Sequence, residues 1–172
     1  MGSLDQLYQQ IILDHAKEKH GFGLREPGPD GYSGQCHQLN PLCGDEVTLR
    51  VDVTGFSGSD VVRDVSWSGD GCSISQAATS TLYDLVVGGT LDQAGTVVAA
   101  FREMVRSRGG ITPDEEVLGD ASAFAGVGRH ANRVKCAMLG WTAFEVALRE
   151  AQLTDRSEQA DDQSNDQSLE AR

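Results

Sequence analysis

Three cysteines and one aspartate lie in short loops where a strand or a helix is expected to begin or end. They are Cys43, Asp45, Cys72 and Cys136, and two of these cysteines stand beside a glycine. Thiolate sulfur and carboxylate oxygen both bind metal ions, and four such ligands suit a tetrahedral ion. The residue types therefore predict a metal centre, which we interpret as the active site.

The spacing of these residues allows them to meet at one end of a domain. Cys43 and Asp45 are separated by one residue, so in an extended segment their side chains point the same way. Cys72 is expected at the N-terminal end of a helix, where free N–H groups and the helix dipole favour a thiolate. We expect Cys136 in the first turn of the last helix, where the same argument applies.

An alternative interpretation is that these are buried structural cysteines, because free cysteine is among the most buried residue types. The sequence contains no C-x-x-C pair, so spacing alone leaves both interpretations open. The metal centre is favoured because each cysteine lies away from an apolar stripe. Asp45 also stands where a carboxylate would otherwise serve only a turn or a helix cap.

The composition limits the classes of partner. The chain has 172 residues and a formal net charge of -12, which fits one domain and disfavours nucleic acid and anionic membranes as partners. No apolar run reaches the length of a membrane span, and no secretory signal pattern is present. We therefore expect a cytoplasmic protein with reduced thiols, in which four cysteines indicate metal binding or catalysis.

The hydrophobic pattern predicts elements that could position these ligands. Apolar residues at helical spacing predict a helix over 3–18 with Ser3 as its N-cap, and alternation predicts strands over 46–53 and 61–68. Further helices are expected from Ser73 or Ser75 to 87, from Thr90 to about 108, and over 134–153. The segments 20–38 and 111–132 have no period and are expected to be irregular.

These elements predict an α+β fold, in which a small antiparallel sheet of about three strands packs helices mainly on one face. We expect one domain over 1–150. The polar, acidic segment 151–172 is low in aromatic residues and is expected to be a disordered tail.

The three cysteine loops together resemble the IscU-like family of iron–sulfur cluster assembly proteins. The matching stretches are Asn-Pro-x-Cys-Gly-Asp at 40–45, Gly-x-Gly-Cys-Ser-Ile-Ser at 69–75 and Arg-x-Lys-Cys-Ala-x-Leu-x-Trp at 133–141. The segment Leu-Tyr-x-x-Ile-Ile-x-Asp-His at 7–15 supports the match. The resemblance covers most of residues 4–150 and implies an IscU-like fold.

Two features resemble the SufU branch of this family. IscU scaffolds carry a histidine before the third cysteine, where this chain has Lys135, and SufU-type proteins carry an insertion that 107–129 could contain. The resemblance then implies a zinc ion held by Cys43, Asp45, Cys72 and Cys136. It also implies that Cys43 accepts persulfide sulfur from a SufS-type cysteine desulfurase.

The sequence leaves three functions open. The first is a zinc-dependent sulfurtransferase that serves iron–sulfur cluster assembly and passes sulfur onward, with a cluster scaffold complex as one acceptor. The second is a scaffold that holds a transient cluster, because thiolates bind iron as well as zinc. The third is an adaptor domain with a structural zinc, which the carboxylate ligand disfavours, since structural sites are usually rich in cysteine and histidine.

Several other residues have a simpler interpretation. Cys36 and His37 lie outside the matched motif and are expected to be a free thiol beside a surface imidazole, with a second sulfur-accepting thiol as the alternative. His15 falls on an apolar stripe and is expected to be a hydrogen-bonded, partly buried side chain. Lys135 and Arg133 either offset the charge of the site or are solvated cations.

Overall fold

The computed structural model of the protein describes residues 2–56 and 59–170, with residue 56 and residues 160–170 described as backbone only. Three strands form one antiparallel sheet in the order β1-β2-β3: β1 (Tyr32–Leu39), β2 (Glu46–Phe56) and β3 (Ser59–Asp70). The predicted alternation of β2 is confirmed, because Val47, Leu49, Val51 and Val53 are all buried. The α+β fold predicted from the sequence is therefore correct.

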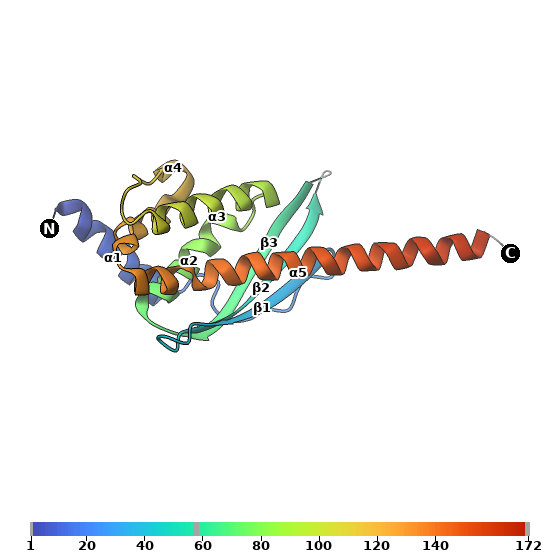
Figure 1. The fold of residues 1–172 in the computed structure, drawn as a ribbon. Helices are drawn as coiled ribbons and strands as arrows, with labels where there is room; N and C mark the ends of the chain where they lie inside the picture. The colour runs from blue at the N-terminus through green and yellow to red at the C-terminus, as the bar shows by residue number, and fades with distance from the viewer. Residues whose placement is uncertain (1, 57–58, 171–172) are drawn as a thin grey trace.

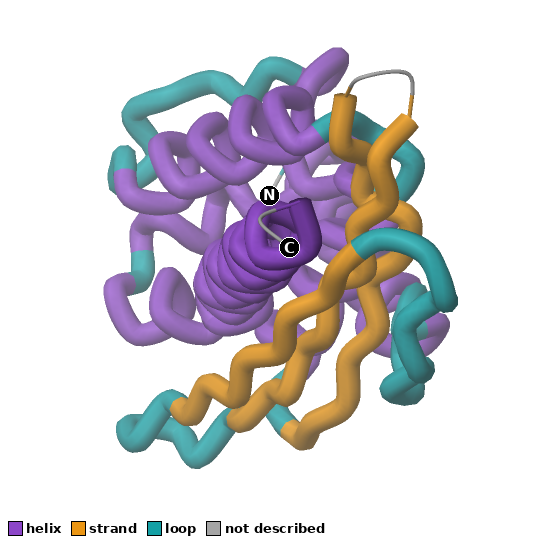
Figure 2. Tube along the Cα trace, turned by 90° about the vertical axis from the view of Figure 1, so that its right-hand side faces the viewer, coloured by secondary structure: helices purple, strands orange, loops and turns teal. Residues whose placement is uncertain are grey.

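The helices gather on one face of the sheet, as Figures 1 and 2 show. They are α1 (Ser3–Glu18), α2 (Ser73–Val86), α3 (Leu91–Arg106), the short α4 (Glu115–Leu118), the 3-10 helix η1 (Gly119–Arg129) and α5 (Ala131–Glu170). The long helix α5 lies across β1 and β2 and also packs on α2, which α1 covers in turn. This arrangement brings the start of α5 close to the ends of the strands.

Close packing between α2 and α5 fixes their relative positions. Gly140 of α5 lies against the side chain of Thr79, where any side chain larger than hydrogen would collide. The indole of Trp141 donates a hydrogen bond to the carbonyl of Ala78 at 2.9 Å. The same ring stacks on Phe101 of α3 with centroids 3.8 Å apart. These contacts determine the register of α5 against α2 and α3, and hence the position of Cys136.

The strand β1 lies inside a segment that the sequence predicts to be irregular. Only Cys36 of this strand is buried, so no clean alternation marks it. The carbonyl of Ala147 in α5 lies directly over Gly34, where a side chain would not fit. Pairing with β2, from Tyr32 opposite Val53 to Leu39 opposite Glu46, defines the strand through tertiary contacts.

Several helix boundaries differ from the sequence predictions. The N-cap of α1 is Gly2 instead of Ser3, and the N-cap of α2 is Cys72 itself. The segment predicted to be irregular over 111–132 contains α4 and η1, in which Leu118, Phe124 and other residues are buried. The N-cap of α3 at Thr90 is confirmed, with its side chain accepting from the backbone of Gln93 at 3.2 Å.

The helix α5 continues past its predicted end near Leu153 and reaches Glu170, projecting beyond the sheet in Figure 1. Ala151 is fully buried in the core, so the packed part of the chain extends through this residue. An unpacked polar helix is marginal in water, and disorder of the segment 151–172 therefore stays a prediction. Within the described ranges, the structure has no helix that combines the length and apolar character of a membrane span.

Candidate metal centre

Cys43 and Asp45 lie in the tight turn that joins β1 to β2. The N–H of Asn40 donates to the carbonyl of Asp45 at 2.8 Å, and the N–H of Gly44 donates back to the carbonyl of Asn40 at 2.8 Å. Gly44 has a φ of 75°, a left-handed conformation that glycine adopts without strain. The left-handed backbone conformation therefore explains why glycine occupies the middle position of the motif Cys-Gly-Asp.

Cys136 reaches this turn from α5. Its Sγ lies 3.7 Å from the Sγ of Cys43. The ligand atoms of Cys43, Asp45 and Cys136 all lie within 4.8 Å of one another. Cys43 is exposed, whereas Asp45 and Cys136 are buried. The structure thus brings together three of the four predicted ligands, one of them open to solvent.

Cys72 lies beside these three groups at the start of α2. Its backbone N–H donates to Asp45 Oδ1 at 3.2 Å, while its exposed thiol points to Ser75 Oγ at 3.8 Å. As the N-cap residue it has the position that the sequence predicts, next to the free N–H groups of the helix. Cys72 also shifts the pKa of both Asp45 and Cys136, so its side chain adjoins the other three groups.

The second carboxylate oxygen of Asp45 is the clearest sign that a metal ion could bind here. Asp45 Oδ2 is buried and has no hydrogen-bond partner within the described residues, although a buried polar atom normally has one. Burial alone would raise the pKa of Asp45, but hydrogen bonds from Cys72 and Ser75 hold this pKa below its ordinary value. The carboxylate is therefore charged, and the donor set of three sulfurs and one oxygen fits zinc.

The position of Cys136 corrects one prediction. Because α5 begins at Ala131, Cys136 lies past the first turn, and the helix-dipole argument for its thiolate does not apply. Burial raises the pKa of the Cys136 thiol, and the neighbouring Cys43, Cys72 and Asp45 raise it further. In this environment a bound cation would displace the thiol proton.

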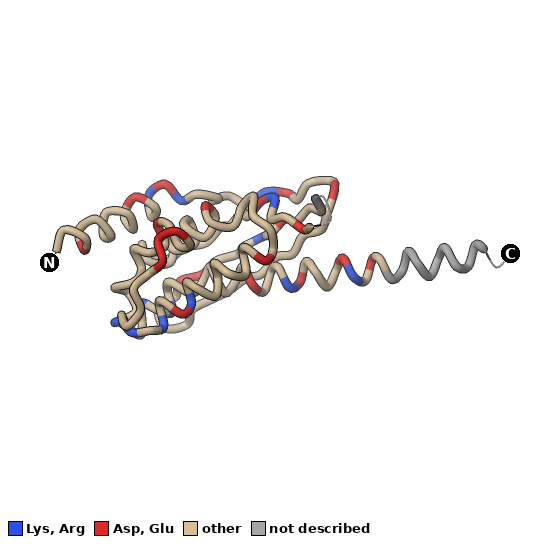
Figure 3. Tube along the Cα trace, turned by 90° about the horizontal axis from the view of Figure 1, so that it is seen from above, with Lys and Arg blue, Asp and Glu red and all other residues tan. Residues whose placement is uncertain are grey.

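The surface near the site is basic, although the chain as a whole is acidic. Arg133 and Lys135 are exposed near the start of α5. Figure 3 shows basic residues gathered at this end of the domain, whereas acidic residues are spread over most other elements. Both predicted roles of these cations, charge compensation and simple solvation, fit this exposed position.

A second group of metal-type ligands lies between α1 and α2. One ligand atom each of His15, His20 and Asp84 lies within 4.8 Å of the others. His15 is buried, with its ring nitrogens 2.8 Å from Ser80 Oγ and 3.0 Å from Asp120 Oδ2. His20 bonds Asp84 at 2.7 Å and Glu18 at 2.8 Å. Hydrogen bonding therefore accounts for this group, as predicted for His15.

Cys36 lies apart from the candidate centre, on β1. It is buried in the core, and Gln38 Nε2 donates to its sulfur at 3.3 Å. His37 is exposed and lies 3.0 Å from Thr48 Oγ1. These positions agree with a free thiol beside a surface imidazole.

Two residues at the site were not predicted to act there. Asn40 is buried and contacts both the turn and Cys136, and Ser75 contacts Cys72 and Asp45. Both residues belong to the stretches that match the family, and this match is the one feature of the sequence that could have indicated a role at the site. Their roles depend on how α2 and α5 pack against the turn, which spacing along the chain does not reveal.

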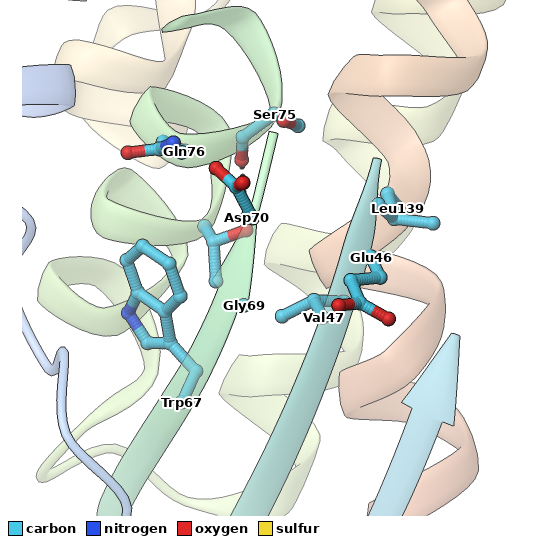
Figure 4. A pocket seen from close by; sticks show the side chains of 9 residues that line it. Glu46, Val47, Trp67, Gly69, Asp70, Ser75, Gln76 and Leu139 are labelled. Carbon is cyan, nitrogen blue, oxygen red and sulfur yellow. Dashed lines mark hydrogen bonds between the residues drawn. The ribbon is translucent and has the colours of Figure 1, made fainter. Parts of the chain in front are cut away.

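A small pocket adjoins the site between the ends of β2 and β3 and the helices α2 and α5. Figure 4 shows Trp67 and Val47 on the strands, Ser75 and Gln76 on α2, and Leu139 on α5 around it. Ser75 belongs to both the pocket and the site. None of the four predicted ligands lines the pocket, so it is separate from the group of thiols.

Comparison with known proteins gives consistent relatives. Residues 7–150 match the family described as NifU-like N terminal domain. The chain is 34% identical over 150 residues to the iron–sulfur cluster assembly scaffold protein IscU of Streptococcus pyogenes serotype M1, which covers 87% of each chain. It is 34% identical over 147 residues to the zinc-dependent sulfurtransferase SufU of Bacillus subtilis (strain 168), covering 85% of this chain and 92% of the relative.

Solved structures agree with these relatives. A candidate iron–sulfur cluster assembly scaffold protein for the SUF system, from Fervidobacterium islandicum AW-1, superposes with a TM-score of 0.65 at 31% identity. That match covers 86% of this chain and 99% of the other. The N-terminal part of a NifU-like protein from Brucella abortus, at 22% identity and a TM-score of 0.69, shares the fold. The chain therefore belongs to the NifU-like N-terminal domain family, together with proteins named IscU and SufU.

Proposed function

We propose that this chain is a zinc-dependent sulfurtransferase of the SufU type. It accepts persulfide sulfur on Cys43 from a SufS-type cysteine desulfurase and passes it on for iron–sulfur cluster assembly. The relative from Bacillus subtilis is named a zinc-dependent sulfurtransferase. The observation that carries the proposal is the unpartnered, buried Asp45 Oδ2 beside the exposed Cys43 thiol and the buried Cys136 thiol.

The four residues that would hold zinc are Cys43, Asp45, Cys72 and Cys136. Bound zinc would keep their sulfurs deprotonated at neutral pH without itself changing oxidation state. Three thiolates and one carboxylate carry more negative charge than one divalent ion neutralises. Exposure therefore favours Cys43 or Cys72 over the enclosed Cys136 and Asp45 as the ligand given up, and the resemblance to the family motif assigns that role to Cys43.

The transfer step needs only the released Cys43 thiolate and the persulfide of the desulfurase. The sulfur of Cys43 attacks the terminal sulfur of that persulfide and forms a new S–S bond. The older S–S bond breaks, and its electron pair stays on the desulfurase cysteine as a thiolate. One persulfide is consumed and one is formed, so the exchange needs no oxidant or reductant.

Two features support the SufU branch over the IscU branch. Lys135 precedes the third cysteine in place of histidine, so the fourth ligand must come from elsewhere, and Asp45 supplies an oxygen within reach. The segment between α3 and α5 is long enough to form α4 and η1. Overall identity does not separate the branches, since relatives with either name are 34% identical to this chain.

The test is the turnover of a SufS-type cysteine desulfurase, measured as alanine or sulfide release with and without this protein. Wild-type protein and Cys36→Ala are expected to stimulate turnover, because Cys36 lies in the core on β1. Cys43→Ala is expected to give no stimulation. If Cys43→Ala stimulates turnover as well as wild type does, the proposal fails.

A second candidate function is a scaffold on which a cluster forms. It is favoured by the relative from Streptococcus pyogenes, which is named a scaffold and is equally similar to this chain. Thiolates also bind iron, and a cluster absorbs visible light. Protein purified without oxygen should be colourless with about one zinc per chain under the first proposal, and brown under the second.

A further inference from the structure

We propose that Asn40 is a positioning residue of the metal centre. It holds Cys136 in place as the retained ligand while it anchors the turn that carries the releasable Cys43. This inference rests on the proposed zinc site, and it adds a residue whose side chain lies outside the ligand set. The side chain of Asn40 is 6% exposed, so its polar atoms need partners within the protein.

The backbone of Asn40 ties the turn together. Its carbonyl accepts hydrogen bonds from the N–H groups of Cys43 at 3.3 Å and Gly44 at 2.8 Å. Its own N–H donates to the carbonyl of Asp45 at 2.8 Å. Asn40 therefore closes the turn through its backbone and fixes the backbone positions of the ligands Cys43 and Asp45.

The side chain of Asn40 divides its two polar atoms between the turn and α5. The N–H of Leu42 donates to Asn40 Oδ1 at 3.2 Å, and Asn40 Nδ2 donates to Cys136 Sγ at 4.0 Å. Because a backbone N–H can only donate, this contact fixes the oxygen toward the turn and the amide nitrogen toward the sulfur. The orientation of the amide is thus set by the fold.

The contact makes the two neighbouring sulfurs unequal. Cys43 Sγ and Cys136 Sγ lie 3.7 Å apart, but Asn40 donates to Cys136, the buried sulfur. An N–H donor stabilises the negative charge of a thiolate, and loss of such an outer contact typically weakens metal binding by roughly 10–100-fold. Cys136 is therefore held while the exposed Cys43 leaves and returns.

The experiment compares two substitutions of Asn40 with a matched control. Asn40→Asp keeps the acceptor for the N–H of Leu42 but replaces the donor toward Cys136 by a second oxygen. Asn40→Ala removes both contacts. Asn132→Asp adds the same charge at an exposed position near the start of α5 and serves as the control. Zinc affinity is measured by competition with a chromophoric chelator.

A second readout is the order in which the cysteines react. Zinc-loaded protein is treated with a small excess of iodoacetamide, and the labelled peptides are quantified by mass spectrometry. In wild-type protein and Asn132→Asp, Cys43 should be labelled well before Cys136. In both Asn40 variants, labelling of Cys136 should approach that of Cys43, and zinc affinity should fall by roughly 10-fold or more.

The proposal is overturned if Asn40→Asp and Asn40→Ala bind zinc as tightly as Asn132→Asp and keep the preference for Cys43. It is also overturned if the metal-free variants lose their helical circular dichroism, since the residue would then act on the fold. Neither readout uses the desulfurase. A wild-type protein that binds zinc but does not stimulate the desulfurase would contradict the proposed function and leave this test intact.

Discussion

The described part of the protein contains two compact groups of side chains that could bind a metal ion, and the groups differ in whether their polar atoms have hydrogen-bond partners. In the group of Cys43, Asp45 and Cys136, one carboxylate oxygen is buried without a hydrogen-bond partner among the described residues, and two sulfurs lie in contact. In the group of His15, His20 and Asp84, every ring nitrogen has a hydrogen-bond partner within 3.0 Å. Proximity of the ligand types is the same in both.

A buried polar atom without a hydrogen-bond partner is therefore a better sign of a ligand site than the proximity of ligand-type residues. The histidine group joins α1 to α2, since His15 and the backbone of His20 both bond Ser80 Oγ. A metal ion there would have to break bonds that already stabilise the fold. In the group of Cys43, Asp45 and Cys136, a bound ion would instead contact Asp45 Oδ2, which has no hydrogen-bond partner among the described residues. The two groups should therefore respond to substitution in opposite ways.

The largest effect is expected for Cys136→Ala on zinc binding. Loss of an inner ligand should weaken zinc affinity by more than about 100-fold, because outer contacts alone account for roughly 10–100-fold. The matched substitution in the other group, His20→Ala, should change the affinity by less than about twofold. Chelator competition measures both. If His20→Ala lost zinc, the histidine group would be the metal site, contrary to this prediction.

The second prediction concerns stability. His15→Ala should lower the free energy of unfolding by about 2 kcal/mol, because it opens a cavity and removes a partner from the buried Ser80 hydroxyl. Urea denaturation of the metal-free protein measures this change. Zinc affinity of the folded variant should match wild type. A variant that is as stable as wild type but binds less zinc would contradict the structural role.

A smaller effect is expected for Asp45→Asn. The amide oxygen can still accept from the N–H of Cys72, but the negative charge that attracts the ion is lost. Zinc affinity should fall by about 10-fold, the lower end of the range for changes that leave the inner ligands in place, because the amide keeps an oxygen for the ion. The measurement is again chelator competition, with Asp70→Asn as the control, because Asp70 is an exposed carboxylate at the end of β3. Equal affinities for the two variants would remove Asp45 from the ligand set.

The smallest effect is a pH dependence at His20. Hydrogen bonding to Asp84 raises the pKa of His20 above its ordinary 6.5, burial opposes this, and Glu18 adds to it. The folded protein thus binds this proton more tightly than the unfolded chain, so the stabilisation is present below pH 6.5 and is lost as the pH rises through the higher folded value. Because the pair is partly exposed, His20→Gln should cost about 0.5 kcal/mol at pH 6 and almost nothing at pH 9.

Urea denaturation of wild type and His20→Gln at the two pH values checks this sign. The difference between the proteins isolates His20, since other titrating groups contribute to both. A larger difference at pH 9 than at pH 6 would mean that the neutral ring is the favoured form in the folded protein.

Elements with strong local signals could be predicted from the sequence. The alternation of β2, the cap of α3 at Thr90 and the extent of α1 all follow from short stretches of chain. The strand β1 was missed because its pairing with β2 and the passage of α5 over Gly34 define it. The first turn of α5 was placed too late, which put Cys136 in the wrong turn of the helix.

The convergence of three candidate ligands could also be predicted, but the difference in their exposure could not. Cys43, Asp45 and Cys136 meet as the spacing of the motifs suggests. Cys43 is exposed and Cys136 is buried. This difference depends on the register of α5 against α2, which the contacts of Gly140 and Trp141 determine. The role of Asn40 depends on the same packing, which brings a sulfur from far along the chain to its amide.

The central claim is that one zinc ion is bound by three sulfurs and one carboxylate oxygen. X-ray absorption at the zinc edge of the purified protein tests it most directly. We expect three sulfurs at about 2.3 Å and one oxygen at about 2.0–2.2 Å from the metal. A first shell of imidazole nitrogens and oxygens, as the group of His15, His20 and Asp84 would supply, would contradict it.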